Sequence, residues 1–282
     1  MKKQTIKTIF KVLGAIILLF ALAGGLFFFI YVKPFIEKME KTQIVNFDDR
    51  LTVIHGGGGN SGVFEGDSLV VVIDTKMEKA SEELRELVSK IAEKKPLLVI
   101  NTHFHPDHVG GNKLFAGSPI IAGGNYNEQI WSKETGTSEG MPTQWVKDSM
   151  VIQLGKETIS IFNLPYDVHT QSDVVVYFHL RKVLFAGDII LNNTTPVIMG
   201  AGTPEGYLKA LDQLNARYYL ESIVPGHGSI AGIAVFDRFK QYFLDMKLAA
   251  TDGEQRAALL EKYKDWTQIP FFMSPRATMR KF

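Results

Sequence analysis

The sequence predicts a sheet-containing core covered by helices on its outer faces, preceded by one membrane-spanning helix. Two patterns predict this. A long uncharged run lies near the N-terminus, and beyond it short β-branched runs alternate with segments of helical periodicity. The chain has 282 residues, 45% of them hydrophobic, which is enough to bury a sizeable core. We therefore divide it into an N-terminal anchor and linker, residues 1–41, and one domain, residues 42–282.

The N-terminal segment Val12–Val32 is an uninterrupted run of 21 uncharged, mostly apolar residues. A helix of this length, rising about 1.5 Å per residue, crosses the ~30 Å hydrocarbon core of a bilayer. Four lysines precede the run and three follow it, which favours a cytoplasmic N-terminus and a main domain exported to the periplasmic or extracellular side. The alternative is a signal peptide cleaved after Ala21-Leu22-Ala23, which would give a secreted protein. Because the run is longer than the usual signal core, we favour a retained anchor in the lipid bilayer.

Hydrophobic periodicity gives the elements of the main domain in order. After a charged connector, Lys33–Asp49, short apolar runs predict strands. The strands are Leu51–Ile54, Leu69–Ile73, Pro96–Ile100, Ile159–Phe162, Val174–Phe178 and Val183–Ala186. Helical patterns cover Glu78–Lys94, Gly206–Arg217 and Ala234–Ala249. The alternation of strands and helices, with hairpins mixed in, predicts helices packed on the outer faces of a sheet core.

Charge and cysteine content narrow the possible functions. With 31 basic and 30 acidic side chains the net charge is +1, so we expect no nucleic-acid partner. The chain has no cysteine, which excludes disulfides and thiolate metal ligands. Any metal must therefore be held by His, Asp and Glu. The sequence leaves the oligomeric state open.

The strongest chemical signal is the segment Thr102–Gly111, with the sequence THFHPDHVGG. Four potential metal ligands fall within six residues directly after a predicted strand: His103, His105, Asp107 and His108. Pro106 and the two glycines favour a tight turn that aims these side chains at one point. Imidazole and carboxylate ligands suit zinc, and also iron or manganese. Since three of only seven histidines cluster here, we interpret the segment as a metal site rather than a polar surface loop.

Three residues farther along the chain extend this site. His169 and His227 each follow a strand-like run in a short segment flanked by Thr, Pro or Gly. Asp188 ends the apolar run Leu184–Gly187. An aspartate in this position is more often a turn or cap residue, but beside the histidines it becomes a candidate bridge between two cations.

The five motifs together resemble the metallo-β-lactamase superfamily. Asp74 ends a strand as the first motif, and the His103–His108 segment is the second; Val168-His169-Thr170, Phe185–Asp188 and Pro225–Gly228 are the third to fifth. The resemblance spans about Thr52 to Ile230. It implies an α+β fold, an αββα sandwich with the site at one edge between the sheets.

The resemblance also implies how the ligands are shared. His103, His105 and His169 would hold one metal ion; Asp107, His108 and His227 would hold a second; and Asp188 would bridge the two. This gives two Zn²⁺ per chain, with Fe or Mn possible. Asp74 would support the ligand loop without binding metal, and Asp173 is either a similar support or simply a polar residue at a strand start.

The expected activity is hydrolysis of an ester-like bond in a small-molecule substrate, such as a thioester, lactone or lactam. A hydroxide between the two metal ions would attack, and Asp107 would orient it or relay its proton as a catalytic residue. Lack of cysteine excludes the lactamase subclass with a cysteine ligand, and His105 argues against the oxygen-reducing diiron members. Two alternatives remain: a sulfur dioxygenase with one iron, and a membrane-attached metal-binding module without turnover.

Two further segments have competing interpretations. Gly56–Gly59 precedes no lysine-serine pair, so we predict a loop or hairpin turn at the sandwich edge instead of a phosphate-binding loop. Residues 131–145 contain two tryptophans. They form either a cover over the substrate or a surface excursion anchored by buried tryptophans.

Overall fold

The computed structural model describes residues 2–124, 128–164, 168–171, 173–198, 202–271 and 273–282. The chain separates into two compact units, Met1–Lys38 and Met39–Phe282. The predicted boundary between residues 41 and 42 lies close to this division. The assignment of the two parts to an anchor and a hydrolase stays a prediction.

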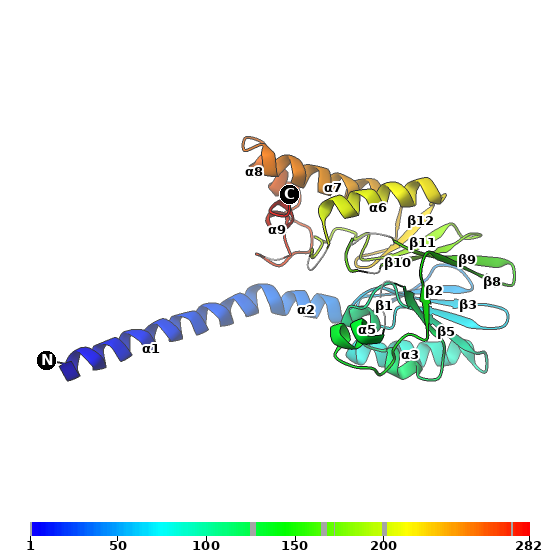
Figure 1. Ribbon diagram of the computed structural model, residues 1–282, viewed down its shortest axis with the longest axis horizontal. Helices are drawn as coiled ribbons and strands as arrows, with labels where there is room; N and C mark the ends of the chain where they lie inside the picture. The colour runs from blue at the N-terminus through cyan, green and yellow to red at the C-terminus, as the bar shows by residue number, and fades with distance from the viewer. Residues whose placement is uncertain (1, 125–127, 165–167, 172, 199–201, 272) are drawn as a thin grey trace. The chain divides into compact units, whose positions relative to one another are not determined.

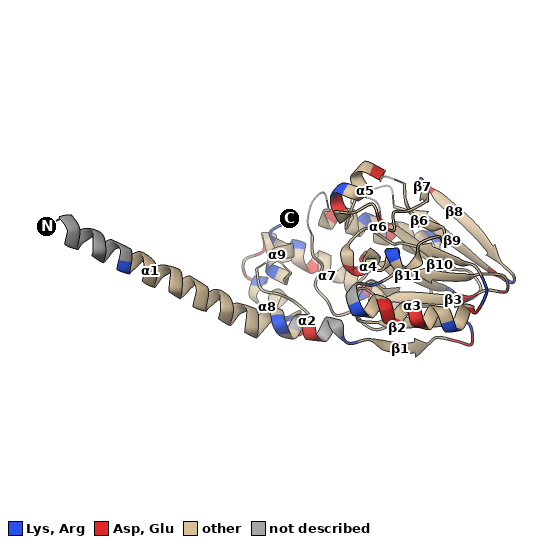
Figure 2. Cartoon of the chain, turned by 90° about the horizontal axis from the view of Figure 1, so that it is seen from below, with Lys and Arg blue, Asp and Glu red and all other residues tan. Residues whose placement is uncertain are grey.

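The N-terminal unit is helical. Helix α1 (Lys2–Phe27) continues into a π-helical turn (Phe28–Val32) and α2 (Lys33–Glu40). Pro34 has no N–H to donate, and the looser π-helical turn ends two residues before it, at Val32. Within these helices Lys11–Val32, with a mean hydropathy of 2.7, is long and apolar enough to cross a membrane, a property that signal sequences share. After Lys11, the rest of this stretch is free of charged side chains in Figure 2.

The second unit contains two mixed sheets. The first has the order β1-β2-β3-β4-β5-β6-β7. Its strands are β1 (Gln43–Asn46), β2 (Leu51–His55), β3 (Ser61–Glu65), β4 (Val70–Ile73), β5 (Leu97–Ile100), β6 (Ile120–Gly123) and β7 (Gln144–Val146). Strands β1 to β4 pair antiparallel, whereas β4 to β7 pair parallel. The carboxyl ends of β4 and β5 therefore meet at one edge of this sheet.

The second sheet has the order β13-β12-β11-β10-β9-β8. Its strands are β8 (Ser149–Leu154), β9 (Glu157–Asn163), β10 (Val174–Phe178), β11 (Val183–Gly187), β12 (Ser222–Pro225) and β13 (Ala231–Gly232). All neighbours pair antiparallel except β11 and β12, which are parallel. Their carboxyl ends therefore also lie at a common edge.

Helices cover the outer face of each sheet, as Figure 1 shows, with α3 beside the first sheet and α6 and α7 beside the second. The helices of this unit are α3 (Glu78–Ala92), α4 (Pro106–Val109), α5 (Glu128–Thr135), α6 (Pro204–Arg217), α7 (Ala234–Thr251), α8 (Arg256–Glu261) and α9 (Pro275–Met279). A short 3-10 helix spans Asn112–Phe115. The predicted four-layer αββα sandwich is confirmed.

The core follows from the period-two alternation of the strands. Val71 and Ile73 of β4 face the layer between the two sheets, whereas Val70 and Val72 face α3. All four are buried, which explains why β4 is a continuous apolar run with no polar face. The outer face of the second sheet packs against an aromatic cluster that includes Tyr207, Phe239 and Phe243.

The structure refines several sequence expectations. Helix α3 ends at Ala92 instead of Lys94, because Glu93 adopts a φ of 52° that leaves the right-handed helix. The expected connector Lys33–Asp49 instead contains α2 and β1. The glycines after His55 form the predicted hairpin turn between β2 and β3, with φ from 66° to 95° at Gly56, Gly57 and Gly58.

The segment 131–145 is partly regular. It begins within α5 and ends in β7. Trp131 is buried and its ring packs against Trp145 at 6.2 Å between centroids. This geometry favours the interpretation of an excursion anchored by tryptophan.

Candidate metal centre

The ligand-rich segment follows β5 at the carboxyl edge of the first sheet. Asp74, directly after the neighbouring strand β4, accepts hydrogen bonds from the Thr102 backbone N–H (2.8 Å) and hydroxyl (2.7 Å). Pro106 then begins the short helix α4, whose first turn contains Asp107 and His108. Since proline is well placed at the first position of a helix, this local sequence turns the chain sharply and points four side chains to one side.

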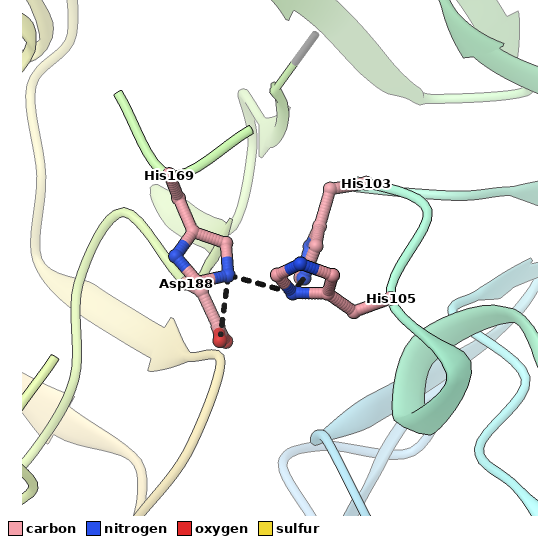
Figure 3. A group of neighbouring side chains, drawn as sticks. All are labelled: His103, His105, His169 and Asp188. Atoms are coloured by element: carbon pink, nitrogen blue, oxygen red, sulfur yellow. Dashed lines mark hydrogen bonds and ion pairs between the residues drawn. The ribbon is translucent and has the colours of Figure 1, made fainter. Parts of the chain in front are cut away.

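A first cluster combines His103, His105, His169 and Asp188 (Figure 3). The Nδ1 atom of His105 lies 3.1 Å from His103 Nε2 and 2.9 Å from His169 Nε2. His169 Nε2 also lies 3.3 Å from Asp188 Oδ2. One ligand atom from each of these side chains therefore faces a common point.

A second cluster combines Asp107, His108 and His227. Asp107 Oδ2 lies 3.2 Å from His227 Nε2 and 3.7 Å from His108 Nε2. The structure thus brings together all seven residues that the sequence predicts as metal ligands, in two adjoining groups.

Asp188 lies between the two clusters. Its Oδ2 atom faces His169, while its Oδ1 atom lies 3.3 Å from His108 Nε2 and 3.5 Å from His227 Nε2. One carboxylate therefore presents one oxygen to each cluster.

The second sheet positions three of these ligands. Asp188 follows β11 and His227 follows β12, and these two strands are parallel neighbours. The close approach requires glycine, because a Cβ at Gly226 would collide with Asp188 Oδ1. His169 is fixed through its backbone, since Asp173 Oδ2 accepts hydrogen bonds from the N–H groups of His169 and Thr170, both at 2.9 Å.

Hydrogen bonds on the far ring nitrogens fix how three histidines face the clusters. His108 Nδ1 lies 2.7 Å from Asp74 Oδ2, and His169 Nδ1 lies 3.0 Å from the Tyr207 hydroxyl. His103 Nδ1 lies 3.1 Å from the Thr102 hydroxyl, which already donates to Asp74 and so accepts from the ring. When each ring is neutral and carries its proton on Nδ1, the Nε2 lone pair of each histidine points into its cluster.

Burial and charge act differently on the two clusters. Burial lowers the pKa of His169 to about 4 and also lowers the pKa values of His103 and His105, so these rings are neutral near pH 7. Burial opposes protonation of His227 too, but the carboxylates of Asp188 and Asp107 raise its pKa to about 9.

Burial and neighbouring charges also shift the pKa values of His108 and Asp173. The pKa of His108 is raised, because the charges of Asp107, Asp74 and Asp188 outweigh its burial. Burial raises the pKa of Asp173 to about 6. A cation would therefore replace protons mainly in the second cluster, where the carboxylates concentrate negative charge.

The residues fit a divalent metal. His108 Nε2 and Asp188 Oδ1 are both buried, and although they lie 3.3 Å apart, neither forms a hydrogen bond of good geometry with the described residues. Leaving two such atoms unsatisfied in the interior is unfavourable. The donor set consists of nitrogen and oxygen atoms, which suits zinc, iron or manganese.

The sequence did not predict a role at this centre for two further residues, Tyr207 and Lys76. Tyr207 lies on α6, and only the fold brings its hydroxyl to His169. Lys76 follows the Asp74-Thr75 pair and is fully buried, although lysine usually lies at the surface. For Lys76, the sequence offers one signal, which is that it lies only three residues after the end of the buried apolar strand β4.

Comparison with known proteins gives the same family. The family model described as the metallo-beta-lactamase superfamily matches residues 55–131. A solved metallo-beta-lactamase from Pontibacter korlensis, 20% identical, superposes with a TM-score of 0.60 over 72% of this chain and 99% of its own. The chain belongs to the metallo-β-lactamase superfamily.

Curated relatives in this family have several activities. The human acyl-coenzyme A thioesterase MBLAC2 is 24% identical over 63% of this chain and 75% of its own length. Metallo-beta-lactamase type 2 of Bacillus cereus is 26% identical over 57% and 63%. Hydroxyacylglutathione hydrolase of Synechococcus sp. (strain JA-3-3Ab) is 30% identical over 53% and 54%. The chain thus spans from about half to three quarters of these relatives.

Proposed function

We propose that the protein is a two-metal hydrolase that cleaves an ester-like bond of the thioester, lactone or lactam class. The observation that carries this proposal is the position of Asp188, whose two oxygens face the two ligand clusters separately. His103, His105 and His169 would hold one ion, Asp107, His108 and His227 the other, and Asp188 both. Zn²⁺ is the expected metal, with Fe or Mn as alternatives.

Two bound divalent ions would supply an acidified water as nucleophile and polarise the bond under attack. The chain's own residues would then position this water and take up its proton. Asp107 is suited to take up a proton, because its side chain is 22% exposed whereas that of Asp188 is only 10% exposed.

The relatives support the substrate class. Their names describe a thioesterase, an acylglutathione hydrolase and a β-lactamase, all of which break an acyl bond. A small-molecule substrate carrying such a bond is therefore expected, and any lactamase activity would be secondary. Support for a sulfur dioxygenase is weaker, because one iron would leave the Asp107, His108 and His227 cluster without a role.

The proposal is tested by loading the full-length protein with Zn²⁺ and screening thioesters, lactones, a chromogenic lactam and phosphodiesters. Asp188→Ala should reduce bound metal from two ions per chain to one or fewer and turnover by at least about 100-fold. The matched control is Asp212→Ala, because Asp212 is an exposed aspartate that pairs with Lys240. Full activity in metal-depleted protein would contradict the proposal, and one iron per chain would favour the dioxygenase.

We also propose that Lys11–Val32 is retained as a membrane anchor with the metal centre on the exported side. Its length and composition support this, as does the lysine distribution around it.

A further inference from the structure

Lys76 is an unusual buried cation next to the metal centre. Its side chain is fully buried, and its backbone has a φ of 60°, in the left-handed region. Both features are unfavourable for lysine, which normally keeps its ammonium group in water. Among the described residues, no carboxylate forms an ion pair with it. Other polar groups must therefore offset the cost of burying the Lys76 ammonium group.

Three backbone carbonyls surround the Lys76 ammonium group. Nζ donates to the oxygens of Ile54 (3.0 Å), Gly56 (2.6 Å) and Gly59 (2.8 Å). An ammonium group has three N–H donors, so its hydrogen-bonding capacity is filled. The acceptors belong to the end of β2 and to the glycine turn Gly56–Gly59. Lys76 therefore holds both ends of this turn.

The glycine turn packs directly on two residues of the second ligand cluster. The Gly59 N–H donates to the Asp107 carbonyl at 3.0 Å. A Cβ on Gly58 would lie 2.8 Å from that carbonyl oxygen, and a Cβ on Gly59 would collide with the His108 ring. The turn therefore forms a wall against which the His108 imidazole and the Asp107 backbone rest.

The same turn reaches the third residue of that cluster. Asn60 Nδ2 donates to the carbonyls of Pro225 (2.8 Å) and Gly228 (2.7 Å), which flank His227. The Lys76 carbonyl in turn accepts from the Gly111 N–H at 2.9 Å, just after the ligand-bearing helix α4. Lys76 thus contacts the glycine turn through its side chain and the ligand loop through its backbone.

We propose that Lys76 is a positioning residue that holds the glycine turn against Asp107 and His108 and so fixes the geometry of the second ligand cluster. The inference rests on the proposed two-metal function, because it assigns Lys76 to one of the two half-sites. Among the described residues, no hydrogen bond joins the glycine turn to the three histidines of the first cluster, which therefore serves as an internal reference.

The positive charge of Lys76 adds a second effect. Burial lowers the pKa of Lys76 to about 7. The carboxylates of Asp74 and Asp107 stabilise its charged form and so oppose this lowering. By symmetry the ammonium group stabilises these two carboxylates, one of which orients His108. An uncharged side chain of similar size would remove this support together with the three hydrogen bonds.

The test is Lys76→Met in the full-length protein, since methionine has a similar volume and no donor. Competition titration with a chromophoric chelator yields two Zn²⁺ affinities. One of the two affinities should fall about 10- to 100-fold, and the other should change by less than about threefold. Lys95→Met is the matched control. Lys95 also donates to a carbonyl, that of Gly66, and to Glu65, but at the opposite end of β3.

The outcomes separate the two proposals. Two unchanged affinities in folded Lys76→Met would overturn the positioning role and leave the two-metal hydrolase intact. An equal fall in both affinities would also overturn it, because it would reveal a general structural role. A wild-type protein that binds only one ion contradicts the two-metal function and the Lys76 proposal together.

If Lys76→Met does not fold, a measurement on the wild-type protein tests the positioning role of Lys76 instead. By thermodynamic linkage, filling the second cluster should stabilise the contacts of Lys76. Acetylation of Lys76, followed by mass spectrometry, should slow at least about tenfold between metal-free protein and protein with two equivalents of Zn²⁺. Acetylation of Lys95 should not change. Equal rates for Lys76 at both metal levels would overturn the proposal.

Discussion

In three histidines of the centre, the ring nitrogen that faces away from the ligand clusters contacts an oxygen atom of a neighbouring side chain. This oxygen belongs to a carboxylate in one case and to a hydroxyl in the other two. His108 meets the carboxylate of Asp74, while His103 and His169 meet the hydroxyls of Thr102 and Tyr207. Each contact selects the tautomer whose other nitrogen faces the cluster. A carboxylate makes the ring a stronger donor to metal than a hydroxyl does, so the partner also tunes the ligand.

The Tyr207 contact can be tested by Tyr207→Phe. This variant removes the acceptor at 3.0 Å from His169 Nδ1 and should weaken Zn²⁺ binding about 10-fold without altering the fold. Equilibrium dialysis measures the affinity. Tyr242→Phe is the control, because Tyr242 is equally buried but donates to Thr278, away from the ligands. Equal affinities in both variants would show that the Tyr207 hydroxyl does not orient His169.

At this scale the sequence could identify the candidate ligands and, through the family resemblance, the supporting residue Asp74, but it could not identify Tyr207 or Lys76. His103, His105, Asp107 and His108 lie within six residues, so the chemistry is visible without the fold. Tyr207 and His169 are 38 positions apart, and an aromatic residue in an amphipathic helix normally indicates only core packing. The role of Lys76 is similarly hidden, since its carbonyl partners, at the end of β2 and in the glycine turn, precede it by 17 to 22 residues.

At the scale of elements, a polar group joins α7 to α8 and the turn after it. Asp245 on α7 accepts hydrogen bonds from Tyr263 and Lys262, each at 2.6 Å, and from Gln241 at 2.8 Å. The carboxylate is buried beside aromatic side chains of the second sheet's outer layer. These contacts keep the C-terminal helices on the sheet that carries Asp188 and His227.

Asp245→Asn should destabilise the protein by about 1–3 kcal/mol at pH 7. Burial tends to raise the pKa of Asp245, but Lys262, Tyr263 and Gln241 lower it overall. A lowered carboxylate pKa gives stability that is complete above the ordinary value of 3.8 and is lost as the pH falls through the folded value. The difference in melting temperature from wild type should therefore shrink below about pH 4. A constant difference from pH 7 to 3 would contradict this assignment.

The prediction of elements succeeded where a pattern was strong. Strands β4 and β10 are continuous runs of β-branched and aromatic residues, and both were expected close to their observed bounds. Strands β6 and β8 were missed because their sequences are short or half exposed, with Val151 on the solvent side. Such strands owe their conformation to pairing with neighbours, a tertiary effect that local sequence does not encode.

At the scale of the whole molecule, the two units can be tested separately. A chain beginning at Met39 should fold, bind metal as the full chain does and appear in the soluble fraction, because Met39–Phe282 is a compact unit of its own. The full chain should stay with membranes after alkaline carbonate washing. Intact mass spectrometry of the membrane-bound protein should give the uncleaved mass. A mature N-terminus at Gly24 would establish signal cleavage instead.

The division of ligands between the two sheets has a consequence for the order of assembly. The first sheet carries His103, His105, Asp107 and His108, whereas His169, Asp188 and His227 follow strands of the second. A growing chain that has emerged only to β7 therefore presents half of each ligand set, and neither half encloses an ion. High-affinity metal capture must wait until both layers have been synthesised and docked, so a tightly held ion marks a molecule that has completed folding.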